Sequence, residues 1–143
     1  MAFQLDTSGV VWITTPGSTA YNLTWDRLSP FTQGYIEALL RDLHESGVRV
    51  GRYAPVAFSD LAPATLAWIM DDCGKWQREW SPSGNLTSHE QGVYLWNLRQ
   101  ADKGSRGIGF PPLTPYLGND GKIYLGKLNH NTLALHQMGV AFL

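Results

Sequence analysis

A glycine-rich segment is the first place where the residue types could do chemistry. The stretch KGSRGIGF runs from Lys103 to Phe110 and contains a second cation, Arg106. Backbone N–H groups next to glycine can turn toward an anion, so a phosphate-binding loop is one interpretation. The spacing fits neither the Walker pattern nor the dinucleotide-binding pattern, and the two prolines that follow argue against a helix there. We favour a glycine-bearing hairpin turn, with a ligand contact as the alternative.

Basic and aromatic residues gather in the C-terminal half of the sequence. From Arg99 to Lys127 the chain has five lysine or arginine residues against two aspartates. If residues 93–99 and 116–125 belong to hairpins of one sheet, these cations would meet aromatic rings, as single-stranded nucleic acid or a nucleotide requires. A solvated sheet edge protected by lysine is the alternative. The candidate binding residues are Arg99, Lys103, Arg106, Lys122, Tyr94 and Trp96.

The remaining reactive residue types form no catalytic or metal-binding pattern. The four histidines lack zinc-ligand spacing, and Cys73 is the only cysteine, so the chain can form no internal disulfide. Asp71 and Asp72 are adjacent in a predicted helix and would point about 100° apart, which suits a solvated face better than acid–base catalysis. Cys73 falls on the apolar side of that helix and is expected in the core. We predict no metal, no cofactor and no enzymatic activity.

Length and composition are those of a globular protein. We predict that residues 1–143 form a single domain, for which the length suffices. A net charge of −1 gives no overall attraction to nucleic acid or to an anionic membrane, so nucleic-acid binding would need a local patch. We find neither a signal-peptide pattern nor an apolar run long enough to span a membrane. Most of the six tryptophans are expected in the core, and the surplus of aromatic residues favours a binding surface.

Two helices are the clearest predicted elements. Residues 30–45 follow a capping serine, begin with proline, repeat apolar residues on one side and end shortly before Gly47. A second helix is expected to start near residues 61–63. Its apolar stripe consists of Leu66, Ile69, Met70, Cys73 and Trp76.

The other segments predict short strands and loops. Residues 3–13 contain two β-prone runs around an Asp-Thr-Ser-Gly turn, which predicts an opening hairpin. We expect residues 92–100, GVYLWNLRQ, to form a strand, because valine, tyrosine and tryptophan favour strands. The segment PPLTP is expected to be neither helix nor strand, whereas residues 116–126 predict a hairpin around an Asn-Asp-Gly turn. The result is an α+β fold in which two main helices pack on a small, mostly antiparallel sheet.

Four segments together carry a resemblance to a known family. They are LSPFTQGYIEALLRDL, FSDLAPATLAWIMDDC, GVYLWNLRQ…GIGF and YLGNDGKIYL. With these segments the chain resembles a family of small uncharacterised accessory proteins of tailed bacteriophages and prophages. The family usually has Arg-Asn-Gly-His-Gly in its glycine-rich hairpin. Here an insertion follows Arg99 and Gln100 and the histidine is missing, so no role of that histidine carries over.

The resemblance implies a phage protein that acts in the cytoplasm of a bacterial host. Together with the lack of catalytic motifs and the surplus of aromatic residues, it predicts a non-enzymatic interaction protein that binds a host or phage macromolecule. An anti-CRISPR-like inhibitor of an anti-phage defence complex is the form that we expect. The alternative is a nucleic-acid or nucleotide-binding protein that uses the basic hairpin. We expect no membrane partner, and the sequence leaves a homo-oligomer open.

Overall fold

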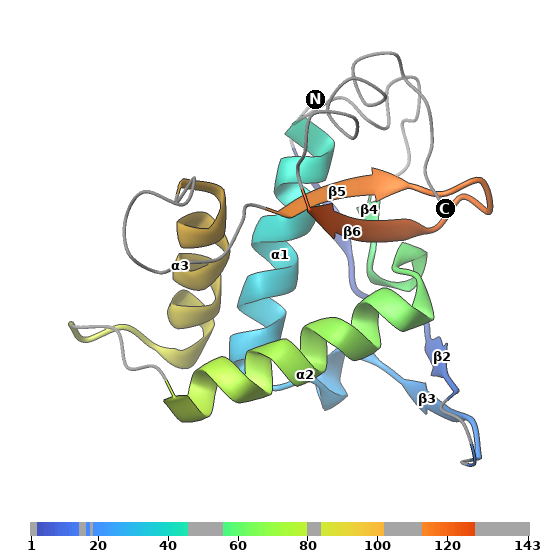
Figure 1. The fold of residues 1–143 in the computed structure, drawn as a ribbon, viewed down its shortest axis with the longest axis horizontal. Helices are drawn as coiled ribbons and strands as arrows, with labels where there is room; N and C mark the ends of the chain where they lie inside the picture. The colour runs from blue at the N-terminus through green and yellow to red at the C-terminus, as the bar shows by residue number, and fades with distance from the viewer. Residues whose placement is uncertain are drawn as a thin grey trace.

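The computed structural model describes residues 3–14, 17, 19–45, 56–79, 84–101 and 113–127. The helices are α1 (Pro30–Glu45), α2 (Pro63–Glu79) and α3 (Ser88–Ala101), and two 3-10 helices cover Trp25–Arg27 and Phe58–Asp60. The strands are β1 (Leu5–Asp6), β2 (Val11–Ile13), β3 (Tyr21–Leu23), β4 (Val56–Ala57), β5 (Leu113–Leu117) and β6 (Ile123–Lys127). This arrangement confirms the predicted α+β class (Figure 1).

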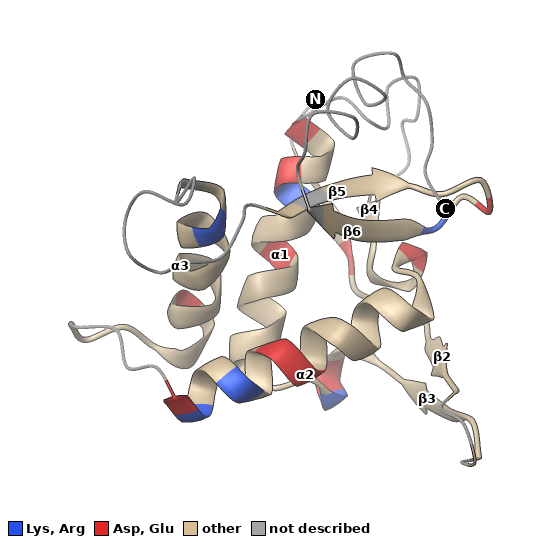
Figure 2. Ribbon diagram, viewed as in Figure 1, with Lys and Arg blue, Asp and Glu red and all other residues tan. Residues whose placement is uncertain are grey.

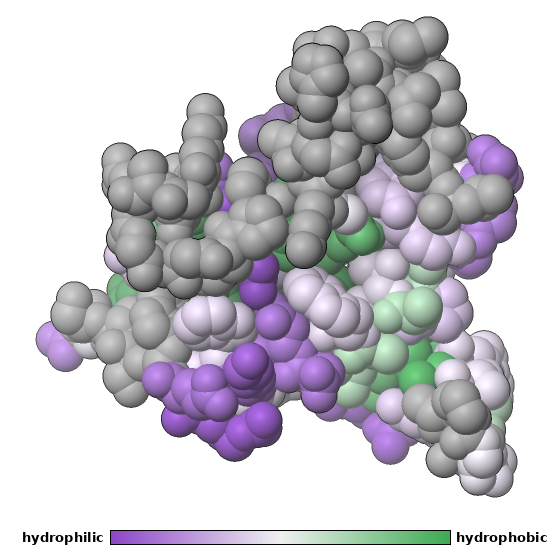
Figure 3. Space-filling view, viewed as in Figure 1, coloured by the Kyte–Doolittle hydropathy of each residue, from purple (hydrophilic) through white to green (hydrophobic). Residues whose placement is uncertain are grey.

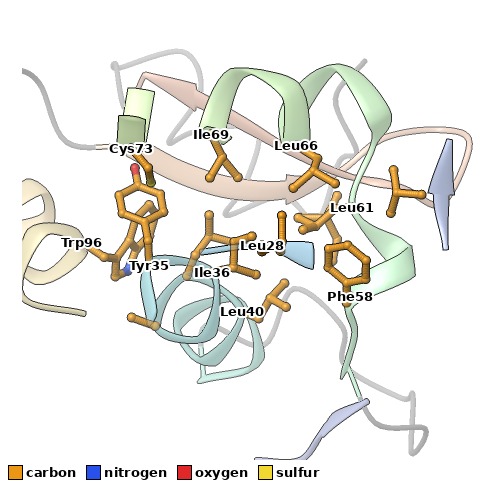
Figure 4. Close-up of a cluster of buried hydrophobic side chains, with 14 of the residues drawn as sticks. Leu28, Tyr35, Ile36, Leu40, Phe58, Leu61, Leu66, Ile69, Cys73 and Trp96 are labelled. Atoms are coloured by element: carbon orange, nitrogen blue, oxygen red, sulfur yellow. The ribbon is translucent and has the colours of Figure 1, made fainter. Parts of the chain in front are cut away.

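Helix α1 is the central element, and α2, α3 and β5 all pack against it. It has the predicted bounds, with Pro30 in the first position. The Ser29 hydroxyl caps it by accepting a hydrogen bond from the Thr32 N–H at 3.2 Å. Its apolar stripe faces α2 across the main core (Figure 4). Buried side chains in this core include Ile36, Leu40, Phe58, Leu66, Ile69 and Trp96.

The predicted strand at residues 92–100 is wrong, because this segment belongs to helix α3. A reciprocal pair of hydrogen bonds starts the helix. The Glu90 N–H donates to the Thr87 hydroxyl at 3.2 Å, and the Thr87 N–H donates to the Glu90 carboxylate at 3.1 Å. The buried positions then recur with the helical period of three and four residues, so packing outweighs the strand preference of the aromatic residues. They are Gly92, Leu95, Trp96 and Arg99.

The described strands form three separate two-stranded sheets in place of one small sheet. The predicted opening hairpin is also wrong. Strand β1 pairs in parallel with β4, with Leu5 opposite Val56, whereas β2 pairs in antiparallel fashion with β3. A turn does separate the two runs, since the Ser8 N–H donates to the Asp6 carboxylate at 2.9 Å. This turn directs β2 toward β3 and does not fold it back onto β1.

The C-terminal hairpin β5–β6 confirms the prediction for residues 116–126, but β5 begins earlier, at Leu113. Three residues of PPLTP are therefore strand, which corrects the expectation for that segment. Pro115 is tolerated because a two-stranded sheet leaves every strand with an edge where no N–H is needed. The Ala62 N–H donates to the Ile123 carbonyl at 2.9 Å and fixes the hairpin to the start of α2.

Two glycines allow α1 and α3 to cross in direct backbone contact. A Cβ built on Gly34 would lie 2.0 Å from the His89 carbonyl oxygen, and one on Gly92 would lie 1.9 Å from the Phe31 carbonyl oxygen. Real Cβ atoms essentially never come within 3.0 Å of such an atom. Only glycine fits at these two positions, and this crossing determines where α3 places its side chains.

Candidate functional site

The hairpin formed by β2 and β3 projects from the body of the molecule (Figure 1). It exposes large apolar side chains. Trp12 is 58% exposed, Tyr21 43% and Val10 40%. Its neighbours Val11 and Ile13 are buried, so β2 turns one face to the core and the face with Trp12 to solvent. We call β2 and β3, together with Val10, the exposed hairpin.

The exposed hairpin lies in a stretch without charged side chains. From Thr7 to Trp25 the sequence has no lysine, arginine, aspartate or glutamate, and β2 and β3 accordingly carry neither charge colour in Figure 2. In the space-filling view, pale and green atoms predominate at β2 and β3, with some purple atoms along the lower edge, whereas purple atoms cover the end of α2 (Figure 3). An uncharged aromatic surface of this kind is typical of the centre of a protein interface.

A group of polar side chains lies inside the molecule, between the helices. The Arg99 guanidinium of α3 donates to the Asp72 carboxylate of α2 at 2.6 Å, and these side chains are only 6% and 15% exposed. The guanidinium carbon also lies over the Trp68 ring, 5.6 Å from its centroid. This ion pair joins α2 to α3, and its cation is withdrawn from the surface.

The Tyr35 hydroxyl points toward Cys73 near this ion pair (Figure 4). Burial raises the pKa of the Cys73 thiol to about 12 and also raises the pKa of Tyr35. Both groups are therefore protonated at neutral pH, and a protonated thiol is a poor nucleophile. Within the described residues the Tyr35 hydroxyl has no hydrogen-bond partner. The expected core position of Cys73 is confirmed.

Two side-chain contacts join α1 to α3 beside the glycine crossing. The Trp96 indole N–H donates to the Asp42 carboxylate at 2.5 Å, and the His89 ring contacts the Glu37 carboxylate. Burial raises the pKa of Asp42, and the hydrogen bond from Trp96 opposes that shift. The indole N–H of the buried Trp96 is thus satisfied by Asp42, an aspartate whose pKa is raised.

Replacing Asp42 with asparagine should make stability less dependent on pH. The folded state raises the pKa of Asp42 above its ordinary 3.8, so this group favours folding in acid, and the contribution is lost as pH rises through the folded-state pKa. Asparagine keeps an oxygen for the Trp96 N–H but does not titrate. The unfolding free energy of the wild type, minus that of Asp42→Asn, should fall from acid to neutral pH in urea titrations. A constant or rising difference contradicts this.

Two of the predicted binding residues lie in the core because residues 93–99 are helical. Arg99 and Trp96 are 5% and 0% exposed and bind the carboxylates of Asp72 and Asp42. Neither side chain is available to the surface patch that a sheet would have formed. This corrects the expectation that the cations of two hairpins gather on one sheet.

The other predicted residues lie apart from these two. Tyr94 is 44% exposed on the outer side of α3. Lys122 is exposed in the β5–β6 turn, where its ammonium donates to the Ser59 carbonyl oxygen at 3.3 Å. Lys103 and Arg106 lie outside the described residues, as does the rest of KGSRGIGF.

Trp12 and Tyr21 of the exposed hairpin belong to no recognisable motif and so escape prediction from the sequence. The available signal is the absence of charge from Thr7 to Trp25 in a region that contains two tryptophans and a tyrosine. Only the burial of alternate residues in β2 reveals that one of these rings faces water.

Comparisons with protein-family models, curated proteins and solved structures give no match to this chain. Among the described residues, none of the helices is both long and apolar enough to cross a membrane. In the same part of the chain, no three histidine, cysteine, aspartate or glutamate side chains gather closely enough to hold a metal ion. We therefore take the exposed hairpin as the candidate site, because it exposes large apolar side chains in a stretch without charged residues.

Proposed function

We propose that this protein acts by binding another macromolecule through the outward face of its exposed hairpin. The observation that carries the proposal is the 58% exposure of Trp12 on a projecting hairpin that has no charged residue of its own. Burying apolar area is worth about 25 cal/mol per Å². A tryptophan at the centre of an interface therefore supplies a large share of the binding energy.

The resemblance to phage accessory proteins supports a host or phage protein complex as the partner. Inhibition of an anti-phage defence system in the bacterial cytoplasm is then the outcome of binding that we propose. Such an inhibitor covers a surface of its target and needs no chemistry of its own. A rigid aromatic anchor suits this task because it loses little conformational entropy on binding.

Replacing Trp12 with alanine should weaken partner binding by about 2 kcal/mol, roughly thirtyfold in Kd. The protein is immobilised, its partner is captured from a bacterial lysate and identified, and the affinity of the purified pair is then measured. Because Trp12 is exposed, the variant should unfold at nearly the same urea concentration as the wild type.

Tyr94→Ala is the matched control, since Tyr94 is similarly exposed but lies on α3. It should leave the affinity nearly unchanged. If Tyr94→Ala abolishes binding and Trp12→Ala does not, the proposed surface is wrong. Affinity should also change little with salt because residues 7–25 carry no charge. A steep loss with salt would favour the nucleic-acid alternative.

A further inference from the structure

We propose that the outer edge of β2 pairs with β2 of a second copy of this chain, which joins two exposed hairpins into one four-stranded antiparallel sheet. This inference goes beyond the proposed function, because it concerns the edge of the strand and not its outward face. It rests on the direction of backbone groups, on the lack of charge and on the symmetry of the pairing.

The direction of the backbone groups follows from a contact on β3. An Arg27 guanidinium nitrogen donates to the Asn22 carbonyl oxygen at 2.9 Å, so this carbonyl points away from β2. In an antiparallel pair, the N–H and C=O of one residue point to the same side, and opposed residues alternate between hydrogen-bonded and non-hydrogen-bonded pairs. Asn22 stands opposite Trp12. The Trp12 N–H and C=O therefore point away from β3, toward the outer edge of β2.

This outer edge is open in the part of the chain that the structure describes. There, β3 is the sheet neighbour of β2. Apart from the pairing of strands, no backbone hydrogen bond between described residues involves the Trp12 N–H or C=O. Charged side chains are one of the means by which natural proteins protect such an edge, and residues 7–25 contain none. The opposite edge, along β3, is covered by the Arg27 side chain at Asn22.

A second copy fits this edge because an antiparallel pairing of identical strands is two-fold symmetric. Trp12 of one copy would stand opposite Trp12 of the second copy, and the two would exchange both N–H···O=C bonds. Val10 would then stand opposite Thr14. Both tryptophans would lie side by side on the outward face, in the position of a cross-strand aromatic pair. Two identical surfaces without charge meet without electrostatic repulsion.

The same geometry limits the assembly to two copies. The pairing uses the β2 edge of each chain and leaves only the β3 edges, where Arg27 occupies the Asn22 carbonyl. A charged side chain at an edge opposes further strand addition. The product is a closed dimer with Trp12 from both copies on one surface, and a partner bound there would contact both chains.

Sedimentation velocity over a wide concentration range tests the dimer with the full chain. The wild type should shift from the monomer mass to twice that mass as concentration rises. Trp12→Lys places equal charges opposite each other and should raise the dimer dissociation constant at least about tenfold. Tyr21→Lys is the control, because it adds the same charge on β3 at an exposed position opposite Ile13, on the other face from Trp12 and away from the pairing edge. It should leave the dimer nearly unchanged.

Hydrogen exchange supplies a readout that needs no substitution. The Trp12 amide should exchange rapidly in dilute protein and at least about tenfold more slowly in concentrated protein, whereas Val11 and Ile13 are protected by β3 in both. A protein that is monomeric at every concentration overturns the dimer. A dimer with the same Trp12 exchange rate as the monomer also overturns it. A monomer that still loses its lysate partner on Trp12→Ala overturns the dimer alone and leaves the proposed function standing.

Discussion

Replacing Gly92 with alanine should destabilise the protein by about 3 kcal/mol or more. The new Cβ would lie 1.9 Å from the Phe31 carbonyl oxygen and 2.8 Å from the Tyr35 nitrogen. Both atoms belong to the backbone of α1, which cannot rotate aside as the end of a side chain can. Helix α3 must therefore move away from α1 as a whole. Urea unfolding followed by circular dichroism should show the loss as a lower transition midpoint.

Two further glycine variants make this result specific to the helix crossing. Gly34→Ala should cost a similar amount, because its Cβ would lie 2.0 Å from the His89 carbonyl oxygen. Gly74→Ala in α2 is the control, since its new Cβ would meet only the Arg78 guanidinium, at 3.4 Å. It should be neutral or stabilising by up to about 1 kcal/mol, because alanine favours helix. Equal midpoints for Gly92→Ala and the wild type would contradict the direct backbone contact.

Replacing Arg99 with methionine should cost about 3 to 5 kcal/mol of folding free energy. The variant leaves the Asp72 carboxylate, only 15% exposed, without the guanidinium that now lies 2.6 Å from it. Leaving one buried charge without its partner destabilises the fold by much more than the intact ion pair stabilises it. It also removes the cation from the Trp68 ring. Urea unfolding of the purified variant at neutral pH measures the effect.

A double-mutant cycle separates the charge from the packing. Arg99→Met combined with Asp72→Leu removes both charges and should recover most of the stability that Arg99→Met loses. Arg99→Lys keeps the charge but not the planar fork, and should fall between the wild type and methionine. If the double variant is as unstable as the sum of the single ones, the ion pair is not what joins α2 to α3.

Elements with strong local signals could be predicted from the sequence. Helix α1 has a serine cap, a first-turn proline and an apolar stripe, and its bounds are the predicted ones. Helix α2 starts at Pro63, within the predicted range for its start, and the β5–β6 hairpin forms around its predicted Asn-Asp-Gly turn, although β5 begins earlier than expected. In these segments the capping residues, the hydrophobic period and the turn residues all favour the same structure.

The remaining elements depend on contacts between distant parts of the chain. Leu5 pairs with Val56, and nothing near either residue in the sequence indicates the other. In α3 the strand preference of tyrosine and tryptophan conflicts with the capping box at Thr87 and Glu90, and burial against α1 decides for helix. Arg99 is absent from the predicted basic patch for the same reason, since it can lie on a sheet surface only if its segment is a strand.

The crossing of α1 and α3 also bears on how the chain folds during synthesis. Trp96 and Asp42, which meet at this crossing, are 54 positions apart. A nascent chain therefore exposes the face of α1 that carries Gly34 until α3 emerges from the ribosome. Until then α1 packs without α3, and isolated helices of this length are marginal in water. We expect slow codons between residues 46 and 87 to prolong chaperone binding and lower the soluble yield.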